Sequence, residues 1–102
     1  LGDVYKRQQL FEAANLMHSY KMHINLAGKA ANTSIGSAAI AHFTRSLPSL
    51  DWDASLSSQY LADDIVENPV SVIEGHIITP EEGPGLGINI DEDKFNQYSV
   101  KL

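Results

Sequence analysis

The apolar residues in the first half of the chain follow two different periods. Between Gln9 and Lys21 they recur at the i, i+3, i+4, i+7 spacing of an amphipathic helix. Between Met22 and Ala27 apolar and polar residues alternate, which is the period of a β-strand. We therefore predict a helix over 9–21 and a short strand over 22–27, which Gly28 ends. The expected stripe of the helix is Leu10, Ala13, Ala14 and Met17, flanked by Phe11 and Tyr20.

A second helix is predicted after this strand. Its start is expected at Asn32 or Thr33, because both side chains are favoured helix caps. Its end is expected at Leu47–Pro48, because the residue before a proline avoids helical geometry. Helix, strand, loop and helix in this order indicate an α/β fold. The expected buried stripe of the second helix is Ile35, Ala38, Ala39, His42 and Phe43.

In the second half, turn residues separate short apolar runs. A turn is predicted over Ser49–Trp52, and Glu74–Gly75 divides two β-branched runs as in a hairpin. Pro80–Phe95 then combines a Gly/Pro turn, a short extended piece and a helix start that Asp91 is expected to cap. The glycines of the turn are Gly83, Gly85 and Gly87, the extended piece carries Ile88 and Ile90 on one side, and Glu92 and Asp93 suit the positive end of the helix dipole.

Composition limits the classes of protein to which this chain can belong. The chain has 102 residues, is 43% hydrophobic and contains no cysteine, which excludes disulfides and thiolate metal sites and is compatible with a cytoplasmic location. No apolar run approaches the roughly 20 residues of a membrane span. Net charge is −6, with the acidic residues concentrated in the second half and no basic patch. We therefore expect neither nucleic acid nor membrane as a partner.

Two segments resemble the mandelate racemase/muconate lactonizing enzyme branch of the enolase superfamily. Pro80–Phe95 is similar to its C-terminal tail, where Gly-Pro-Gly-Leu-Gly precedes a short strand and an acidic helix. Gly28–His42 is similar to the segment after the seventh barrel strand, a Gly-x-x-x-Glu-x-Ser-Ile-Gly pattern leading into a small-residue helix. The resemblance implies an α/β fold: the C-terminal portion of a TIM-like (β/α) barrel, with its last two strand positions, plus a C-terminal hairpin and tail.

The same resemblance implies candidate site residues at the mouth of the barrel. Asn32 stands where the family pattern has a glutamate, and is the candidate catalytic residue. An amide forms hydrogen bonds but exchanges no proton at neutral pH, so an acid role at this position is in doubt. Gly28 and Lys29 are the candidate substrate-binding residues. No metal ligand is expected in this chain.

Residues 53–62 resemble the eighth strand and its loop. Dipeptide epimerases of the superfamily carry Asp-x-Asp there, and the absence of a well-placed pair argues against dipeptide substrates; Asp51 and Asp53 lie too early. Without the family, Ser57–Val66 can equally be a helix with Tyr60, Leu61 and Ile65 inward, and both interpretations stay open here.

The resemblance implies an activity for a larger parent enzyme. Members abstract a proton α to a carboxylate and use Mg²⁺, held by carboxylates from middle strands, to stabilise the enediolate. The expected parent is a racemase, cycloisomerase or dehydratase (an isomerase or lyase) acting on a small carboxylate, and a homo-oligomer. The chain itself is expected to bind no Mg²⁺ and to be inactive alone. The alternative is a small stand-alone acidic α/β interaction module without catalysis.

Three boundaries follow from these patterns. Residues 1–8 resemble a translated sequencing adapter from a cloned environmental source, the alternative being a natural frayed N-terminus, and are set aside from fold reasoning. Residues 9–66 are expected to be the partial barrel and 67–102 the hairpin and tail. Asp63–Glu67 is interpreted as a solvated acidic turn rather than a metal site. Of the histidines, His42 is expected to be a satisfied core residue, and no histidine pair has metal-ligand spacing.

Overall fold

The computed structural model describes residues 3–48 and 53–101, with side chains from Arg7 onward. The turn predicted over Ser49–Trp52 lies outside the described residues. The elements are α1 (Asp3–Ser19), β1 (Leu26–Ala27), α2 (Ser34–Arg45), β2 (Ala54–Ser55), the 3-10 turn η1 (Ser58–Tyr60), β3 (Val72–Ile73), β4 (His76–Ile77) and α3 (Glu92–Tyr98). This mixture of helices and small sheets confirms the α/β class.

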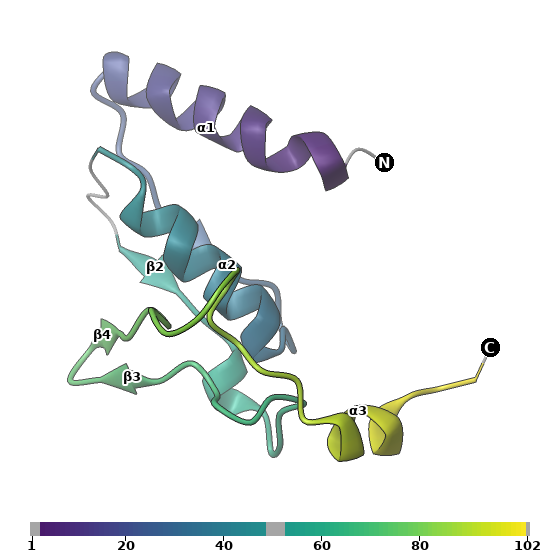
Figure 1. Ribbon diagram of the computed structural model, residues 1–102. Helices are drawn as coiled ribbons and strands as arrows, with labels where there is room; N and C mark the ends of the chain where they lie inside the picture. The colour runs from purple at the N-terminus through teal and green to yellow at the C-terminus, as the bar shows by residue number, and fades with distance from the viewer. Residues whose placement is uncertain (1–2, 49–52, 102) are drawn as a thin grey trace.

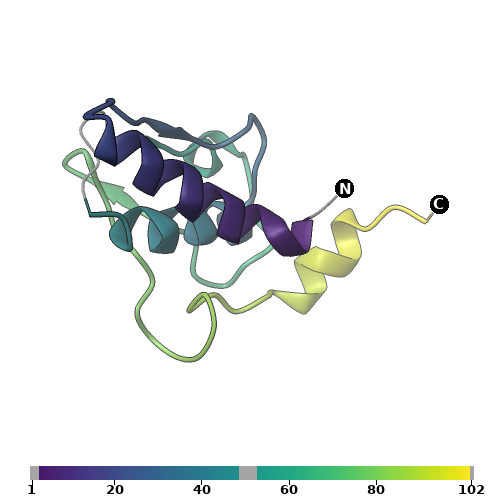
Figure 2. The same ribbon diagram turned by 90° about the horizontal axis from the view of Figure 1, so that it is seen from above.

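Two small sheets hold the fold together. β1 and β2 are parallel, with Leu26 opposite Ala54 and Ala27 opposite Ser55. β3 and β4 form the antiparallel hairpin that the sequence predicts around Glu74–Gly75. α2 lies against the parallel pair, while the Gly/Pro segment passes alongside α2 (Figure 1). Figure 2 shows α1 crossing over α2, and α3 projecting at the right with the C-terminus.

The core forms where α2 meets β2 and the hairpin. Ala38, Leu56 and Val70 are buried and in contact, because β2 continues into Leu56 beneath the small face of α2. The half-buried side chains packed against them are Ile40, Ile77, Leu86 and Ile88. Leu86 and Ile88 belong to the Gly/Pro segment, so this segment contributes to the core and its backbone has to lie close to the core residues.

The buried face of α2 differs from the predicted stripe. Only Ala38 of that stripe is buried; Ala39 is exposed, and Ile35, His42 and Phe43 are half-buried. The helix instead buries Ser34, Ser37, Ala38 and Ala41, which follow the i, i+3, i+4, i+7 spacing. Small side chains at these positions let α2 lie close to its neighbours. Because two of the four are serines, a search for hydrophobic residues alone does not identify this buried face.

α1 forms in the predicted region but begins at Asp3, six residues before Gln9 and inside the segment set aside as adapter-like, and it buries little. Of its predicted stripe only Ala14 is buried, whereas Leu10 is 49% exposed. Phe11 makes the clearest contact, its ring stacked at a tilt on that of Phe43 with 4.5 Å between centroids. The helix also ends at Ser19, so the predicted flanking residue Tyr20 lies beyond it and is 73% exposed.

Two further expectations are corrected. Within residues 3–48 and 53–101, the strand predicted over Met22–Ala27 is paired at Leu26–Ala27 alone, opposite Ala54–Ser55. The helical alternative for Ser57–Val66 is wrong: the segment forms a 3-10 turn at Ser58–Tyr60, then bends and a single bridge residue at Val66, and Tyr60 is 80% exposed rather than inward. Residues 53–62 contain the two-residue strand β2 and the loop after it, while their place as an eighth barrel strand stays a prediction.

The Gly/Pro tail follows the sequence prediction closely. Gly83, Gly85 and Gly87 all have positive φ. Asp91 caps α3, since its side chain accepts a hydrogen bond from the Lys94 amide at 3.1 Å. Ile90 pairs with Val66 in an isolated antiparallel bridge, which fixes the tail beside residues 65–67.

Candidate functional site

The loops that follow β1 and β2 meet at one end of the parallel pair. The Gly28 amide donates to the Ser55 carbonyl at 2.9 Å, which extends the ladder one residue past β1. The Ser57 hydroxyl donates to the Lys29 carbonyl, so the second loop fixes the backbone of the first. Ligands of parallel α/β folds bind at the carboxyl ends of the strands, which is where these loops lie. This end of the sheet is therefore the candidate site.

A pocket of about 470 Å³ opens beside these loops. Its size falls within the range of small-molecule sites. The described residues that line it carry hydroxyl, amide and apolar groups but no charged side chain. Its wall includes Gly28, Ala30, Ser55, Leu56, Ser57, Gln59 and Tyr60, with Val72, Gly75 and Ile77 of the hairpin opposite.

The three sequence-predicted site residues share one loop but occupy different positions in it. Gly28 lies in the pocket wall. Lys29 is exposed, with its carbonyl bonded to Ser57. Asn32 is half-buried and lies outside the pocket lining. The loop turns tightly between them, since the Asn32 amide donates to the Lys29 carbonyl at 3.3 Å.

Two glycines make room for the Asn32 side chain. A Cβ built on Gly36 would lie 3.3 Å from Asn32 Nδ2, and one built on Gly28 would lie 3.6 Å from the same atom. The Gly28 Cβ would also lie 3.3 Å from Ile40 Cδ1. The side chain of Asn32 is thus packed between the start of α2 and the end of β1, which restricts where its amide can point.

A buried polar network fixes the start of α2 and hence this loop. Asp64 Oδ2 accepts from the Ser34 amide at 2.9 Å, and Ser34 Oγ accepts from the Val70 amide at 2.9 Å. One turn further on, the Ser37 hydroxyl donates to Ser58 Oγ at 2.7 Å. Thr33 is the cap residue by position but makes no side-chain cap, so a distant carboxylate replaces it.

Sequence reasoning missed Ser57 and misjudged Asp64. Asp64 is 8% exposed, so it is not part of a solvated turn, although Asp63 and Glu67 on either side are exposed. Its partner lies 30 residues away, so no local pattern marks it. Ser57 follows a strand directly, and a hydroxyl there is too common to single out from one sequence.

Asp63 and two residues of α3 shift one another's pKa. Lys94 Nζ lies 2.6 Å from Asp63 Oδ1, and the Tyr98 hydroxyl donates to Asp63 Oδ2 at 3.0 Å. The hydrogen bond from Lys94, helped by those from the Asp64 amide and Tyr98, lowers the pKa of Asp63 below 3.8. The same bond raises the pKa of Lys94, and the bond to Asp63 raises that of Tyr98. These contacts fix α3 to the Asp63 side chain.

No group of three or more potential metal ligands lies together within residues 3–48 and 53–101. The chain's described residues therefore do not fit a magnesium site of their own. His42 is half-buried, and its Nε2 lies 3.0 Å from the Leu86 carbonyl, as expected of a satisfied core histidine. His76 Nδ1 lies 3.0 Å from the Glu74 carbonyl at the hairpin turn.

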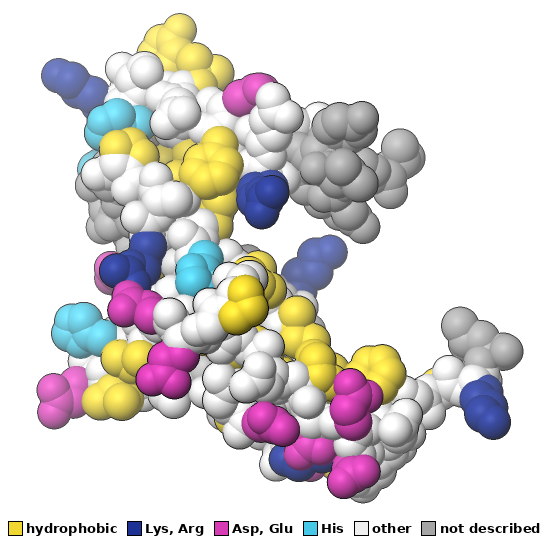
Figure 3. All heavy atoms as spheres, in the orientation of Figure 1, with side chains coloured by type: hydrophobic (Ala, Val, Ile, Leu, Met, Phe, Trp, Pro, Cys, Tyr) yellow, Lys and Arg dark blue, Asp and Glu magenta, His cyan; other side chains and the backbone are white. Residues whose placement is uncertain are grey.

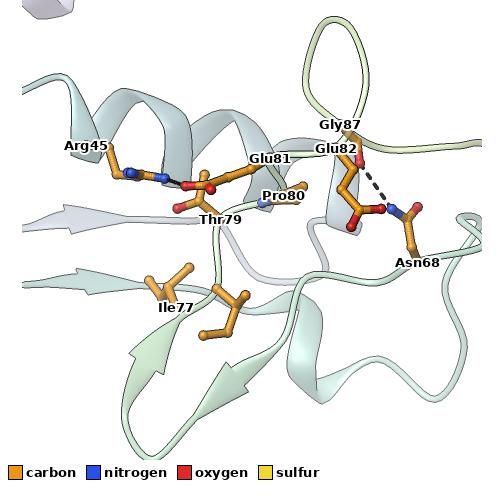
Figure 4. A pocket seen from close by; sticks show the side chains of 9 residues that line it. Arg45, Asn68, Ile77, Thr79, Pro80, Glu81, Glu82 and Gly87 are labelled. Atoms are coloured by element: carbon orange, nitrogen blue, oxygen red, sulfur yellow. Dashed lines mark hydrogen bonds and ion pairs between the residues drawn. The ribbon is translucent and has the colours of Figure 1, made fainter.

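A larger hollow of about 640 Å³ lies between the hairpin, the Gly/Pro segment and the end of α2 (Figure 4). Arg45 and Glu81 form an ion pair at one end, and Asn68 donates to the Gly87 carbonyl at 3.0 Å at the other. Isoleucine side chains of the hairpin form its apolar floor. No strand end of the parallel pair reaches this hollow, so we favour the smaller pocket as the candidate site.

Among the described helices, none has the length and apolar content to span a bilayer.

The chain is similar to known proteins over most of its length. The family described as "Enolase C-terminal domain-like" matches residues 8–94. Chloromuconate cycloisomerase of Pseudomonas putida is 33% identical over 73 residues, which is 71% of this chain and 20% of that protein. Chloromuconate cycloisomerase of Cupriavidus pinatubonensis is 32% identical over 87 residues, or 84% of this chain and 23% of that protein.

Solved structures of cycloisomerases are also similar to this chain in their fold. The crystal structure of 2-chloromuconate cycloisomerase from Rhodococcus opacus 1CP matches with a TM-score of 0.80 and 26% identity, over 88% of this chain and 24% of that one. The chain thus spans about a fifth to a quarter of the length of the relatives that it matches. The sequence match over residues 8–94 and the shared fold show that the chain belongs to the enolase C-terminal domain-like family.

Proposed function

We propose that this chain is the C-terminal section of a Mg²⁺-dependent enzyme that abstracts a proton α to the carboxylate of a small substrate. In this proposal β1 and β2 are the last two strands of a TIM-like barrel, and their loops form one edge of the active-site mouth. The observation that carries the proposal is the hydrogen bond from Ser57 to the Lys29 carbonyl, which joins the two loops at the carboxyl ends of parallel strands. The similarity to cycloisomerases favours a cycloisomerase over a racemase or dehydratase.

Each of the three loop residues has a distinct proposed role. The Lys29 ammonium is exposed and attracts the substrate carboxylate. Asn32 lies outside the pocket lining, but its Nδ2 would lie 3.6 Å from a Cβ built on the pocket residue Gly28. Its proposed role is a hydrogen bond to a substrate that extends past Gly28, without exchange of a proton. Gly28 has no side chain and lies in the pocket wall, so its proposed role is to let the substrate approach the backbone there. Proton abstraction itself requires a base from another part of the whole enzyme.

None of the roles proposed for the residues of this chain involves binding Mg²⁺. Its described residues bring no ligand cluster together, and when bound in the whole enzyme the ion would stabilise the enediolate. We propose that the parts of the parent that hold it lie outside this chain, and that the parent is a homo-oligomer. The isolated chain should therefore show no turnover of chloromuconate with Mg²⁺ present, and measurable turnover by the purified chain would contradict this.

A chimera tests the positive part of the proposal. In a hybrid protein, here termed the chimera, residues 8–94 of this chain, which match the family, replace the corresponding segment of the Cupriavidus pinatubonensis chloromuconate cycloisomerase. With chloromuconate as substrate we expect measurable kcat/KM. Lys29→Ala should lower it about 10-fold to 100-fold, since a charge-assisted hydrogen bond contributes about 1.5–3 kcal/mol. Asn32→Ala should lower it up to about tenfold.

Lys21→Ala is the matched control, because Lys21 is equally exposed but precedes β1 and so lies away from its carboxyl end. It should leave kcat/KM unchanged. A folded chimera in which Lys29→Ala and Lys21→Ala have equal effects would refute the assigned role of Lys29. Folding is verified independently by circular dichroism and gel filtration.

A further inference from the structure

The buried face of α2 reaches the turn that follows β2. The Ser37 hydroxyl of α2 donates to Ser58 Oγ at 2.7 Å, across 21 positions of the chain. Ser58 is the first residue of the 3-10 turn η1. Ser34, one turn earlier on the same helix face, bonds to Asp64 and Val70, which lie in other segments. The Ser37 hydroxyl therefore joins α2 to η1.

Both hydroxyls of this pair lie away from water. Ser37 is fully buried and Ser58 is 7% exposed. Among the described residues, no buried side-chain nitrogen or oxygen lacks a hydrogen-bond partner. Removal of one hydroxyl leaves the other buried without its partner, whereas removal of both leaves no unpaired group. The two residues should therefore act as a unit when they are replaced.

The residues next to Ser58 line the candidate pocket. Ser57, Gln59 and Tyr60 belong to its wall, and Ser58 does not. The Ser57 hydroxyl donates to the Lys29 carbonyl of the first loop. The Gln59 side chain donates to the backbone carbonyl three residues before it at 3.2 Å, and the Tyr60 amide donates to the Ser57 carbonyl at 3.1 Å. Because these residues adjoin Ser58 in one short turn, a shift of Ser58 moves this wall of the pocket.

We propose that Ser37 and Ser58 are positioning residues for substrate binding. Their hydrogen bond fixes η1 where its residues form the pocket wall and where Ser57 reaches the Lys29 carbonyl. The inference rests on the proposed function, which makes this pocket part of the substrate site. Neither hydroxyl touches the substrate, because neither residue lines the pocket. Loss of the bond should weaken substrate binding more than it slows the reaction, since the base comes from another part of the whole enzyme.

Surface charge does not account for such an effect. Figure 3 shows a group of acidic side chains over the part of the molecule that carries α3. The described residues that line the pocket carry no charge. Serine-to-alanine substitutions leave every charge in place, so the electrostatic attraction of a substrate carboxylate is unchanged. A change in KM therefore reports the geometry of the pocket wall.

The kinetic test uses the chimera with chloromuconate as substrate. Ser37→Ala and Ser58→Ala should each raise KM about 3-fold to 10-fold and change kcat by less than about twofold. The double variant should raise KM no further than either single variant, because groups that bond to each other have non-additive effects. Ser46→Ala is the matched control and should leave KM unchanged, since the Ser46 hydroxyl donates to the Phe43 carbonyl at the far end of α2.

Two kinetic results would overturn the proposal. One is an unchanged KM in both single variants, whether or not kcat falls, because a fall in kcat alone is what a smaller folded fraction produces. The other is a double variant whose KM rises by the product of the two single effects, which would mean that the two hydroxyls act separately.

Hydrogen exchange in the 102-residue chain separates this proposal from the proposed function. The Leu61 amide donates to the Ser58 carbonyl at 3.1 Å and so closes η1. Its exchange should become at least about threefold faster in Ser37→Ala and stay unchanged in Ser46→Ala. Equal exchange in the two variants overturns the positioning role even if the chimera is active. Faster exchange in Ser37→Ala together with an inactive chimera supports the hold of Ser37 on the turn and contradicts the proposed function alone.

Discussion

The Asp64 carboxylate and the Ser34 amide form a hydrogen bond of 2.9 Å that connects the start of α2 to a loop 30 residues further along the chain. Both residues are buried. A negative charge at a helix N-terminus interacts favourably with the helix dipole, and a charged acceptor makes a strong bond to a backbone amide. This contact positions the loop that carries Asn32, because α2 begins two residues after it.

Removing that carboxylate should loosen the start of α2. In Asp64→Ala the buried Ser34 amide loses its acceptor, a change that costs about 1–3 kcal/mol. Native-state hydrogen exchange of the α2 amides should therefore become about 10-fold to 100-fold faster. Glu67→Ala is the control, because Glu67 is exposed and only its backbone amide is bonded, to the Asn89 carbonyl. Equal exchange in the two variants would show that Asp64 does not hold the helix.

The small face of α2 should not tolerate large side chains. Ala38 is fully buried between the helix and the core, whereas its neighbour Ala39 is exposed. Ala38→Leu should destabilise the chimera by about 1–3 kcal/mol through overpacking. Ala39→Leu adds the same atoms at an exposed position and should change stability by less than about 0.5 kcal/mol. Thermal unfolding compares the two, and a shift of the same size in both would contradict the observed helix orientation.

Gly87 is the most constrained glycine of the Gly/Pro turn. Its φ is +70°, and a Cβ there would lie 3.0 Å from both Cβ and the carbonyl oxygen of Pro80. Gly85 has a similar φ of +67° but no atom within 4 Å of a built Cβ. Gly85→Ala should cost about 1–2 kcal/mol from backbone strain alone, and Gly87→Ala about 1–3 kcal/mol more from the clash. Equal unfolding midpoints in the chimera would show that the turn relaxes freely.

Attachment of α3 should depend on pH at both extremes. The pKa of Asp63 is lowered from 3.8, so its contribution is present above that value and is lost as pH falls through the lower, folded-state pKa. The pKa values of Lys94 and Tyr98 are raised from 10.5 and 10.0, so their contributions are present below those values and are lost as pH rises through the raised ones. All three groups are solvent-accessible, so the effect should weaken with salt.

Chemical shifts of the α3 amides report this dependence. They should remain constant between about pH 5 and pH 9 and move outside that window, and Asp63→Asn should remove the acid transition. A titration that is identical in the wild-type chain and the Asp63→Asn variant would mean that other carboxylates control α3.

Local sequence patterns predicted the elements that interactions between nearby residues determine. The α3 cap at Asp91, the positive-φ glycines and the hairpin at Glu74–Gly75 each depend on residues within a few positions, and the structure confirms all three. The presence of α1 and α2 follows from periodicity, although α1 begins six residues before Gln9 and α2 ends at Arg45, two residues before Leu47. The buried faces of the two helices do not follow from periodicity, because they depend on which elements pack against each helix.

The candidate site shows the same limit. The family pattern located Gly28, Lys29 and Asn32, but the bond from Ser57 and the cap by Asp64 join residues 28 and 30 positions apart. Such pairs form only after the chain has folded, so a single sequence carries no signal for them. The functional roles of the three loop residues stay predictions that the chimera tests.

The most direct test of the account is the urea unfolding of the isolated chain, followed by circular dichroism at several protein concentrations. A section of a larger barrel has an open strand edge and a half-exposed α1, so we predict a broad transition whose midpoint changes with concentration. A single sharp transition that is independent of concentration would contradict the account. It would show that the chain is a self-sufficient module, and its family membership would then describe its fold but not its activity.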